Sequence, residues 1–97
     1  MSLSTHVLDA TTGRPAAGIR VELRGGATGV TDADGRCRLV DGDLGPGEHE
    51  LTFHTGDHFP DTFYPRVTVT FTVRDPAAHH HVPLLLSPWA YTTYRGS

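Results

Sequence analysis

Histidines are the residues of this sequence whose number and spacing first suggest chemistry. The chain of 97 residues carries seven of them, and the histidine side chain gains or loses its proton near neutral pH. His79, His80 and His81 follow one another, which suggests a metal site. In a strand, however, only His79 and His81 would share a face, and zinc needs three or four converging ligands. We therefore expect no required metal, even with His6 close to the run.

Alternating side chains assign two of these histidines to strand faces. In residues 3–8 the odd positions suit a core, so His6 points to the opposite face. In residues 79–86, His81 falls on one of two faces that are both largely apolar. A sandwich covers only one face of each sheet with its other sheet, so we expect the second face to meet another subunit. His6 and His81 could then line the same cleft. The remaining histidines are interpreted as polar surface residues: His49, His54 and His58.

Charge and composition exclude several partners. Eight basic and eleven acidic side chains give a formal charge of −3, and the absence of a basic run argues against a nucleic-acid partner. The single cysteine, Cys37, excludes an intramolecular disulfide and is interpreted as a packed residue. The sequence contains neither a signal-peptide pattern nor an apolar run of ~18 residues. We therefore expect no membrane partner and a cytoplasmic protein.

Short alternating segments between turn residues predict an all-β sandwich. Ile19, Val21 and Leu23 alternate with charged residues, and the stretch 67–73 alternates apolar residues with threonine, as strands prefer. Clusters of glycine, proline and aspartate interrupt the pattern at short intervals, as in sandwiches and barrels. The length suits a single domain, 1–97. We place strands near 3–8, 18–24, 28–31, 36–40, 48–54, 66–73, 79–86 and 89–95, and at most one short helical turn, within 56–63.

Several motifs spread over the chain carry a family resemblance. They are LSTHVLD at 3–9, GRPAAG at 13–18, GVTDADGR at 29–36, FYP at 63–65, HVPLLLSP at 81–88 and YRGS at 94–97. Together they resemble the 5-hydroxyisourate hydrolases, which are transthyretin-like enzymes. The YRGS tail is the most specific motif, because it combines a sequence with a position at the chain end. The first half alone also resembles carboxypeptidase regulatory-like modules, which are usually non-catalytic.

The resemblance implies a transthyretin-like (prealbumin-like) two-sheet β-sandwich of seven to eight strands. It implies a homotetramer, built as a dimer of dimers with active sites in clefts between the dimers. The implied activity is hydrolysis of 5-hydroxyisourate to 2-oxo-4-hydroxy-4-carboxy-5-ureidoimidazoline in urate (purine) catabolism, with no cofactor. The family's functional residues carry over onto His6, Arg36 and His81, and onto the tail formed by Tyr94, Arg95, Gly96 and Ser97.

The implied reaction opens a cyclic amide with water, which needs a positioned base at neutral pH. One of His6 and His81 would accept the proton of the water, and the other would position the substrate or donate a proton. The sequence leaves open which does which. Arg36 would present a planar fork of donors to substrate oxygens and to charge that develops on them. The tail would form a wall of the pocket, with Thr92 facing the same cleft.

Two alternatives from other classes of protein stay open at this point. A carrier of the transthyretin type would hold a small ligand in the channel between dimers without turning it over. Transthyretin lacks these histidines and this tail, which favours the enzyme. A structural β-sandwich module would normally be one unit of a longer chain, and it would not need a terminal YRGS.

Overall fold

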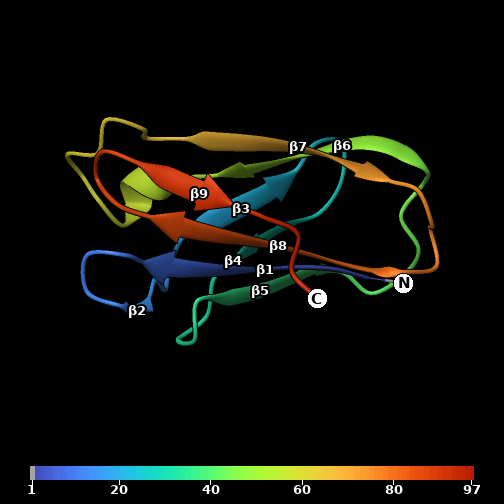
Figure 1. Ribbon diagram of the computed structural model, residues 1–97, viewed down its shortest axis with the longest axis horizontal. Coiled ribbons are helices and arrows are strands. Elements are labelled where there is room, and N and C mark those ends of the chain that lie inside the picture. The colour runs from blue at the N-terminus through green and yellow to red at the C-terminus, as the bar shows by residue number, and fades with distance from the viewer. Residues whose placement is uncertain (1) are drawn as a thin grey trace.

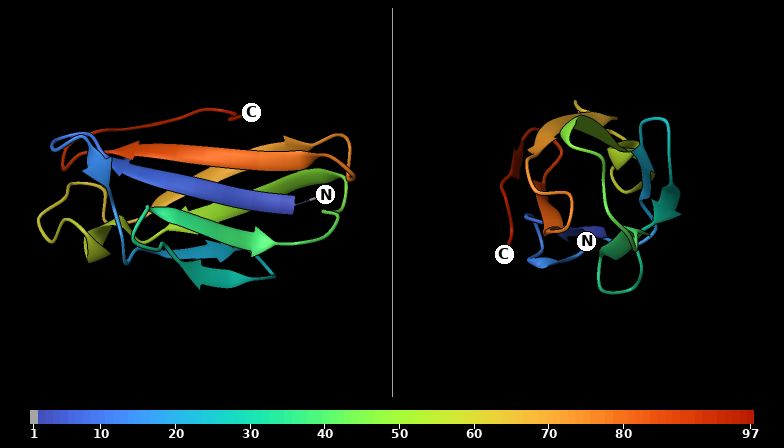
Figure 2. Two further views of the ribbon diagram at one scale, coloured as in Figure 1. Left: turned by 90° about the horizontal axis from the view of Figure 1, so that it is seen from below. Right: turned by 90° about the vertical axis from the view of Figure 1, so that its right-hand side faces the viewer.

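Two β-sheets pack face to face in the computed structural model, which describes residues 2–97 (Figure 1). In the first sheet, β1 (Ser2–Asp9) pairs on one side with β8 (His79–Leu86), which pairs in turn with β9 (Tyr91–Thr93). On its other side, β1 pairs with β2 (Arg14–Pro15) and β5 (Arg36–Val40). The second sheet has the order β4 (Thr28–Val30), β3 (Arg20–Leu23), β6 (Gly47–Phe53) and β7 (Val67–Val73). Figure 2 shows the two layers and the C-terminal tail, which runs along the outer side of the first sheet.

The predicted all-β sandwich is confirmed, and most strands lie where the alternation places them. The predictions at 36–40 and 79–86 coincide with β5 and β8. The strand predicted at 89–95 is shorter, because a turn closed by a hydrogen bond from Ser87 N to Ala90 O delays the start of β9. The described residues form nine strands rather than seven or eight. The additional strand, β2, has two residues and no alternation that could have revealed it.

One helical turn, η1 (Thr55–Asp57), connects the second sheet to the loop before β7. It overlaps the segment 56–63 predicted to hold such a turn and begins one residue earlier. Within residues 2–97 no helix is long and apolar enough to cross a membrane.

The space between the sheets is filled by alternate side chains of their strands. In β1, Leu3, Thr5 and Val7 are fully buried, as predicted, and the Thr5 hydroxyl donates to the carbonyl of Val82 at 2.6 Å. Cys37 of β5 is also buried, as expected. Further core residues are Ile19, Val21, Leu51, Phe53, Val67, Val73, Leu84 and Leu86. Because alternate residues enter this core, the even positions of β1 and the odd positions of β8 are left on the outer face of the first sheet.

The central pairing of the first sheet joins the two ends of the chain. β1 and β8 run parallel over their whole length, with Ser4 opposite His81 and His6 opposite Pro83. On the other edge of β1, β5 runs antiparallel and places Arg36 opposite His6. Residues that lie opposite each other in a sheet point to the same face. This sheet therefore gathers on one surface the side chains of Ser4, His6, Arg36, His81 and Pro83.

A tight turn before β5 fixes the position of Arg36. The Asp32 carboxylate accepts hydrogen bonds from the backbone N–H groups of Asp34 and Arg36, both at 2.9 Å. Gly35 follows with a φ of 74°, in the left-handed region that favours glycine. A Cβ at this position would collide with the carbonyl oxygen of Val7. The turn thus lies directly against β1, and Gly35 O accepts a hydrogen bond of 2.7 Å from Val7 N.

The interpretation of His49, His54 and His58 as simple surface residues needs correction. All three are half-buried. His49 Nε2 donates to Gly45 O at 2.6 Å, and His54 Nε2 lies 3.2 Å from a carboxylate oxygen of Glu22 without hydrogen-bond geometry. His58 Nε2 lies 2.8 Å from an oxygen of the Asp9 carboxylate, whose side chain is only 7% exposed. Polar partners on neighbouring strands and loops, which local periodicity does not reveal, draw these rings inward.

Candidate active site

The outer face of the first sheet brings together His6, Arg36 and His81. The register places Arg36 directly opposite His6, and His81 lies diagonally across from His6, opposite Ser4. His6 and His81 are half-buried, whereas Arg36 is exposed. Three residues that are distant along the chain thus share one surface, and two imidazoles and one guanidinium face the same solvent-accessible region.

A hollow of about 340 Å³ lies in this surface, and Arg36, the residue opposite His6, lines it. Its lining includes two of the three predicted catalytic residues, Arg36 and His81, and the last residue of the tail, Ser97. Four further polar residues contribute to its walls: Ser4, Thr5, Arg38 and His79. The hollow is therefore rich in hydrogen-bond donors and positive charge, and suits a small molecule with several carbonyl oxygens.

The tail reaches the hollow by packing directly on His81. Gly96 N donates to the carbonyl of His81 at 2.9 Å. A Cβ on Gly96 would collide with Cδ2 of the His81 ring and would lie 3.2 Å from Pro83. Only a residue without a side chain permits this approach. Gly96 therefore holds the tail against the imidazole rather than offering a side chain to a ligand.

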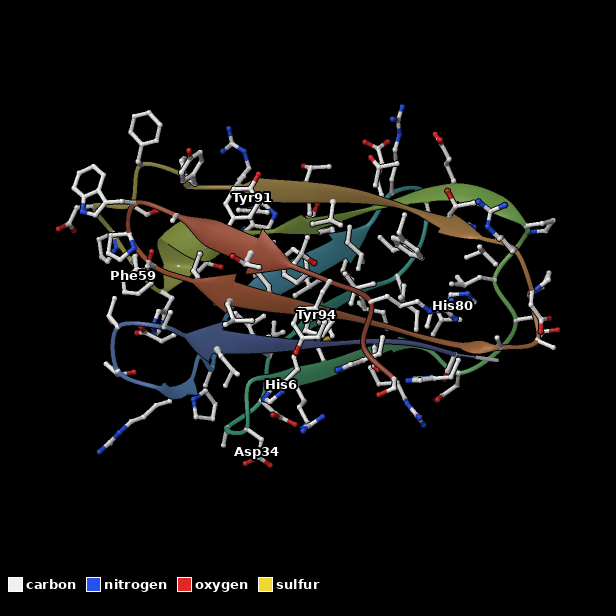
Figure 3. All side chains as sticks on the ribbon, in the orientation of Figure 1. His6, Asp34, Phe59, His80, Tyr91 and Tyr94 are labelled. Carbon is white, nitrogen blue, oxygen red and sulfur yellow. The ribbon has the colours of Figure 1, made fainter. Side chains whose placement is uncertain are left out.

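The hydrogen bond of His6 fixes the distribution of its protons. Its Nε2 lies 2.9 Å from the backbone carbonyl oxygen of Asp34. A carbonyl oxygen only accepts, so Nε2 carries the hydrogen. Neutral His6 consequently has its lone pair on Nδ1. Figure 3 shows His6 beside the turn that contains Asp34, so the same turn orients both His6 and Arg36.

His81 differs from His6 in its partner and in its pKa. Its Nδ1 lies 2.9 Å from the hydroxyl of Ser4, which can donate or accept. Burial lowers the pKa of His81 below its usual value of 6.5, and the positive charges of His79, Arg36 and His6 lower it further. His81 is therefore neutral at physiological pH, the state in which an imidazole can accept a proton.

The other predicted residues of the site lie farther apart. Tyr94 is 55% exposed and projects over the sheet toward His6 (Figure 3). Thr92 lies opposite Leu85, on the outer face but toward the far end of β8, and does not line the hollow. Arg95 lines a second pocket of about 290 Å³, together with Tyr94, Val69 and Phe71. The tail thus borders two separate pockets, one over the first sheet and one against β7.

His80 faces this second pocket and lies inside the sandwich edge. It is 7% exposed, and its Nδ1 has no hydrogen-bond partner among the described residues. Burial lowers its pKa, and the nearby charge of Arg95 contributes in the same direction. His79 and His81, by contrast, share the outer face with ring centroids 6.2 Å apart. No group of three or more His, Cys, Asp or Glu residues within 2–97 is arranged to hold a metal ion.

Sequence reasoning did not single out Ser4, Arg38 or His79 as parts of the site. The alternation already implied that Ser4 shares a face with His6, and that His79 shares one with His81. The sequence does not reveal the parallel register of β1 and β8, which sets Ser4 beside the rings of His79 and His81.

Together, the fold and the site define a class of protein: a transthyretin-like β-sandwich in which ionisable side chains line a hollow on the outer face of one sheet. The chain belongs to the HIUase/Transthyretin family, whose model matches residues 3–96. It is 46% identical to the 5-hydroxyisourate hydrolase of Deinococcus radiodurans over 113 residues, which cover 98% of this chain and 95% of that one. It is 42% identical to the 5-hydroxyisourate hydrolase of Mus musculus over 114 residues, which cover 98% and 94%.

Two solved structures extend the comparison. The Klebsiella pneumoniae 5-hydroxyisourate hydrolase superposes with a TM-score of 0.90 at 38% identity, over 100% of both chains. Sea bream transthyretin, solved in complex with thyroxine, superposes with a TM-score of 0.84 at 30% identity, over 97% of this chain and 93% of that one. A hydrolase and a thyroxine-bound transthyretin therefore share this fold, and the residues of the site must distinguish their functions.

Proposed function

We propose that this protein hydrolyses 5-hydroxyisourate to 2-oxo-4-hydroxy-4-carboxy-5-ureidoimidazoline, as a step of urate catabolism. The observation that carries the proposal is that Arg36 and His81 line one hollow on the outer sheet face, and that His6 shares this face, directly opposite Arg36. The near full-length similarity to 5-hydroxyisourate hydrolases from a bacterium and a mammal supports it. We also propose that the reaction takes place in the cytoplasm, in keeping with the free Cys37.

His81 is the proposed general base. It is neutral at physiological pH because burial and positive neighbours lower its pKa, and its Nδ1 is bound to Ser4, which leaves Nε2 for the attacking water. The water adds to the carbonyl carbon of the cyclic amide, and its proton passes to His81. His81 then returns the proton to the nitrogen that leaves as the C–N bond breaks.

Arg36 is the proposed partner of the substrate carbonyl oxygen, and His6 is the proposed partner of a substrate N–H group. The Nε2 hydrogen of His6 is bound to the carbonyl of Asp34, so the lone pair of Nδ1 is left for the substrate. It would accept a hydrogen bond from an N–H group of the substrate ring and so orient that ring. Arg36 donates to the carbonyl oxygen as negative charge develops on it, a stabilisation worth about 3–4 kcal/mol for a good donor. Tyr94, Gly96 and Ser97 would form the wall on the tail side, and Arg95 and Thr92 its outer margin.

The proposal includes a homotetramer, a dimer of dimers whose clefts enclose these sites. The outer face of the first sheet supports such an assembly, because it carries the partly exposed Leu8 and Leu85 on the same face as the polar hollow. A face of this kind favours contact with another subunit. Contact with another subunit would also exclude water from the substrate and so strengthen the substrate's interactions with Arg36.

A carrier function, suggested by the likeness to thyroxine-bound transthyretin, fits the hollow less well. A carrier needs an apolar tube, whereas this hollow is bordered by Arg36, Arg38, His79 and His81. The experiment below separates the two functions, because only an enzyme consumes the substrate.

The test generates 5-hydroxyisourate in the cuvette from urate and urate oxidase, and follows its ultraviolet absorbance as it decays. We expect the protein to accelerate the decay well beyond spontaneous hydrolysis. His6→Ala, Arg36→Ala and His81→Ala should each lower kcat/KM by about 100-fold or more. His49→Ala and Arg24→Ala, which remove the same residue types outside the site, should leave the rate unchanged. No acceleration by the folded protein would refute the proposed function, and full activity of all three site variants would refute the site.

A further inference from the structure

A chain of hydrogen bonds leads from His81 to the end of the first sheet. Ser4 Oγ lies 2.9 Å from His81 Nδ1 and 3.2 Å from His79 Nε2. His79 Nδ1 is in turn hydrogen-bonded to the hydroxyl of Ser2. The two rings are nearly parallel, with an interplanar angle of 17°. Since His79 is exposed and His81 half-buried, the chain connects the site with solvent.

The hydroxyl of Ser4 carries a single hydrogen and can donate it to only one of the two rings. If Ser4 donates to His79 Nε2, it must accept from His81 Nδ1, and His79 Nδ1 donates to Ser2. Every donor in the chain then has an acceptor. In this arrangement His81 carries its hydrogen on Nδ1 and keeps the lone pair of Nε2, as a base requires.

Hydrolysis of a cyclic amide creates a need for such a chain. One hydrogen of the water goes to the leaving nitrogen, which stays neutral because it belongs to a ureido group. The other remains on the new carboxylic acid, whose usual pKa is about 4, so that it ionises at neutral pH. Each turnover therefore releases one proton inside the site.

We propose that Ser4 and His79 are positioning residues that hold His81 in the Nδ1–H tautomer and relay the released proton to solvent. The proton of the new acid binds His81 Nε2, the Nδ1 proton moves to Ser4, and the Ser4 proton moves to His79 Nε2. His79 then loses its Nδ1 proton to water. After the product leaves, the chain resets in the opposite direction: His79 Nδ1 takes up a proton from solvent, one proton moves from His79 Nε2 to Ser4 and one from Ser4 to His81 Nδ1, and His81 Nε2 gives its proton to water in the emptied hollow. The relay step rests on the proposed function, whereas the tautomer does not.

The surroundings of His81 favour the removal of a proton rather than its retention. The groups around it are His79 on its own strand, His6 on β1, Arg36 and Arg38 on β5, and Ser97 of the tail. The positive side chains of this group disfavour a protonated, positively charged His81. Among them only His79 is joined to His81 through a hydroxyl group.

The tautomer is tested by ¹⁵N NMR of histidine-labelled protein without substrate, at about pH 8, where imidazoles are neutral. We expect His81 to carry its hydrogen on Nδ1 in the native protein and in Ser4→Thr, which keeps the hydroxyl. Ser4→Ala should lose this preference, whereas Ser87→Ala, which removes a serine hydroxyl at a distant turn, should not. An Nε2–H tautomer in the native protein, or no change in Ser4→Ala, would overturn the proposal.

The relay is tested by buffer rescue of His79→Ala in the hydroxyisourate assay. In dilute buffer its kcat should fall about tenfold, the effect of one lost hydrogen-bonded partner. Added imidazole at constant pH and ionic strength should restore the rate, but leave the native rate unchanged. An unaltered kcat in His79→Ala, or a loss that imidazole does not relieve, would refute the relay. A protein with no hydrolase activity at all would instead refute the proposed function, and the NMR result would remain independent of it.

Discussion

At the scale of single residues, the two imidazoles of the site differ because their partners differ. His6 faces a carbonyl oxygen, which permits only an N–H donor at Nε2. His81 faces the hydroxyl of Ser4, which can donate or accept, so its tautomer depends on the next partner in the hydrogen-bond chain, His79. The same residue type thus offers a lone pair at Nδ1 in one case and at Nε2 in the other. Such second partners are what define the role of a histidine in a site.

The lowered pKa of His81 predicts the pH dependence of the reaction. A base must be neutral, so activity should be lost as the pH falls through the pKa of His81. Because burial, His79, Arg36 and His6 all lower that pKa, the acidic limb should have its midpoint below 6.5. Stopped-flow measurement of kcat/KM between about pH 5 and pH 8, with spontaneous decay subtracted, checks this. A midpoint above 6.5 would contradict the assignment of His81 as the base.

At the scale of elements, the site depends on one strand pair and one turn. The parallel pairing of β1 with β8 sets Ser4 beside His81, and the turn before β5 sets Arg36 beside His6. β1 is the strand that pairs with both β8 and β5. The geometry of the site is therefore as rigid as the contacts that this central strand makes on its two edges.

Gly35 is the element-scale position most sensitive to substitution. Gly35→Ala forces a side chain into the left-handed region and against the Val7 carbonyl. Gly25→Ala is the matched control, since Gly25 has a similar φ of 72° but open space around it. The control should lose about 1–2 kcal/mol of unfolding free energy, and Gly35→Ala clearly more, together with activity. Urea titration measures the unfolding free energy of the two variants, and the hydroxyisourate assay measures their activity. An equal loss of unfolding free energy in the two variants would show that the turn does not press on β1.

At the scale of the whole molecule, the outer sheet face combines a polar site with apolar side chains. Leu8 and Leu85 lie opposite each other on this face. Both remain partly exposed in the single chain. A surface of this kind is typical of subunit contacts, and it links the proposed assembly to the proposed activity.

Leu85→Glu should therefore dissociate the assembly without unfolding the chain. A charge placed in an apolar contact is costly unless it is paired, so the mass measured by light scattering should fall below that of a tetramer. Leu84→Ala, one residue away but fully buried in the core, should instead destabilise the fold by about 2–5 kcal/mol. An unchanged mass for Leu85→Glu would place the subunit contact on another face.

The sequence by itself determined which residues form strands and which face each side chain takes. The odd positions of β1, the alternation in β7 and the extent of β8 followed from period-two patterns, because adjacent side chains of a strand point to opposite faces. The family resemblance pointed to His6, Arg36 and His81, and the period-two patterns assigned His6 and His81 to strand faces that could line one cleft.

Only the tertiary structure decided which of these faces lie side by side. The pairing of β1 with β8 joins residues more than 70 positions apart, and local periodicity holds no information about such a partner. For this reason the sequence did not indicate β2, the links from Ser4 to His79 and His81, or the separation of Arg95 from Ser97 into two pockets. A strand specifies its own faces through its backbone geometry, whereas its neighbours depend on packing of the whole chain.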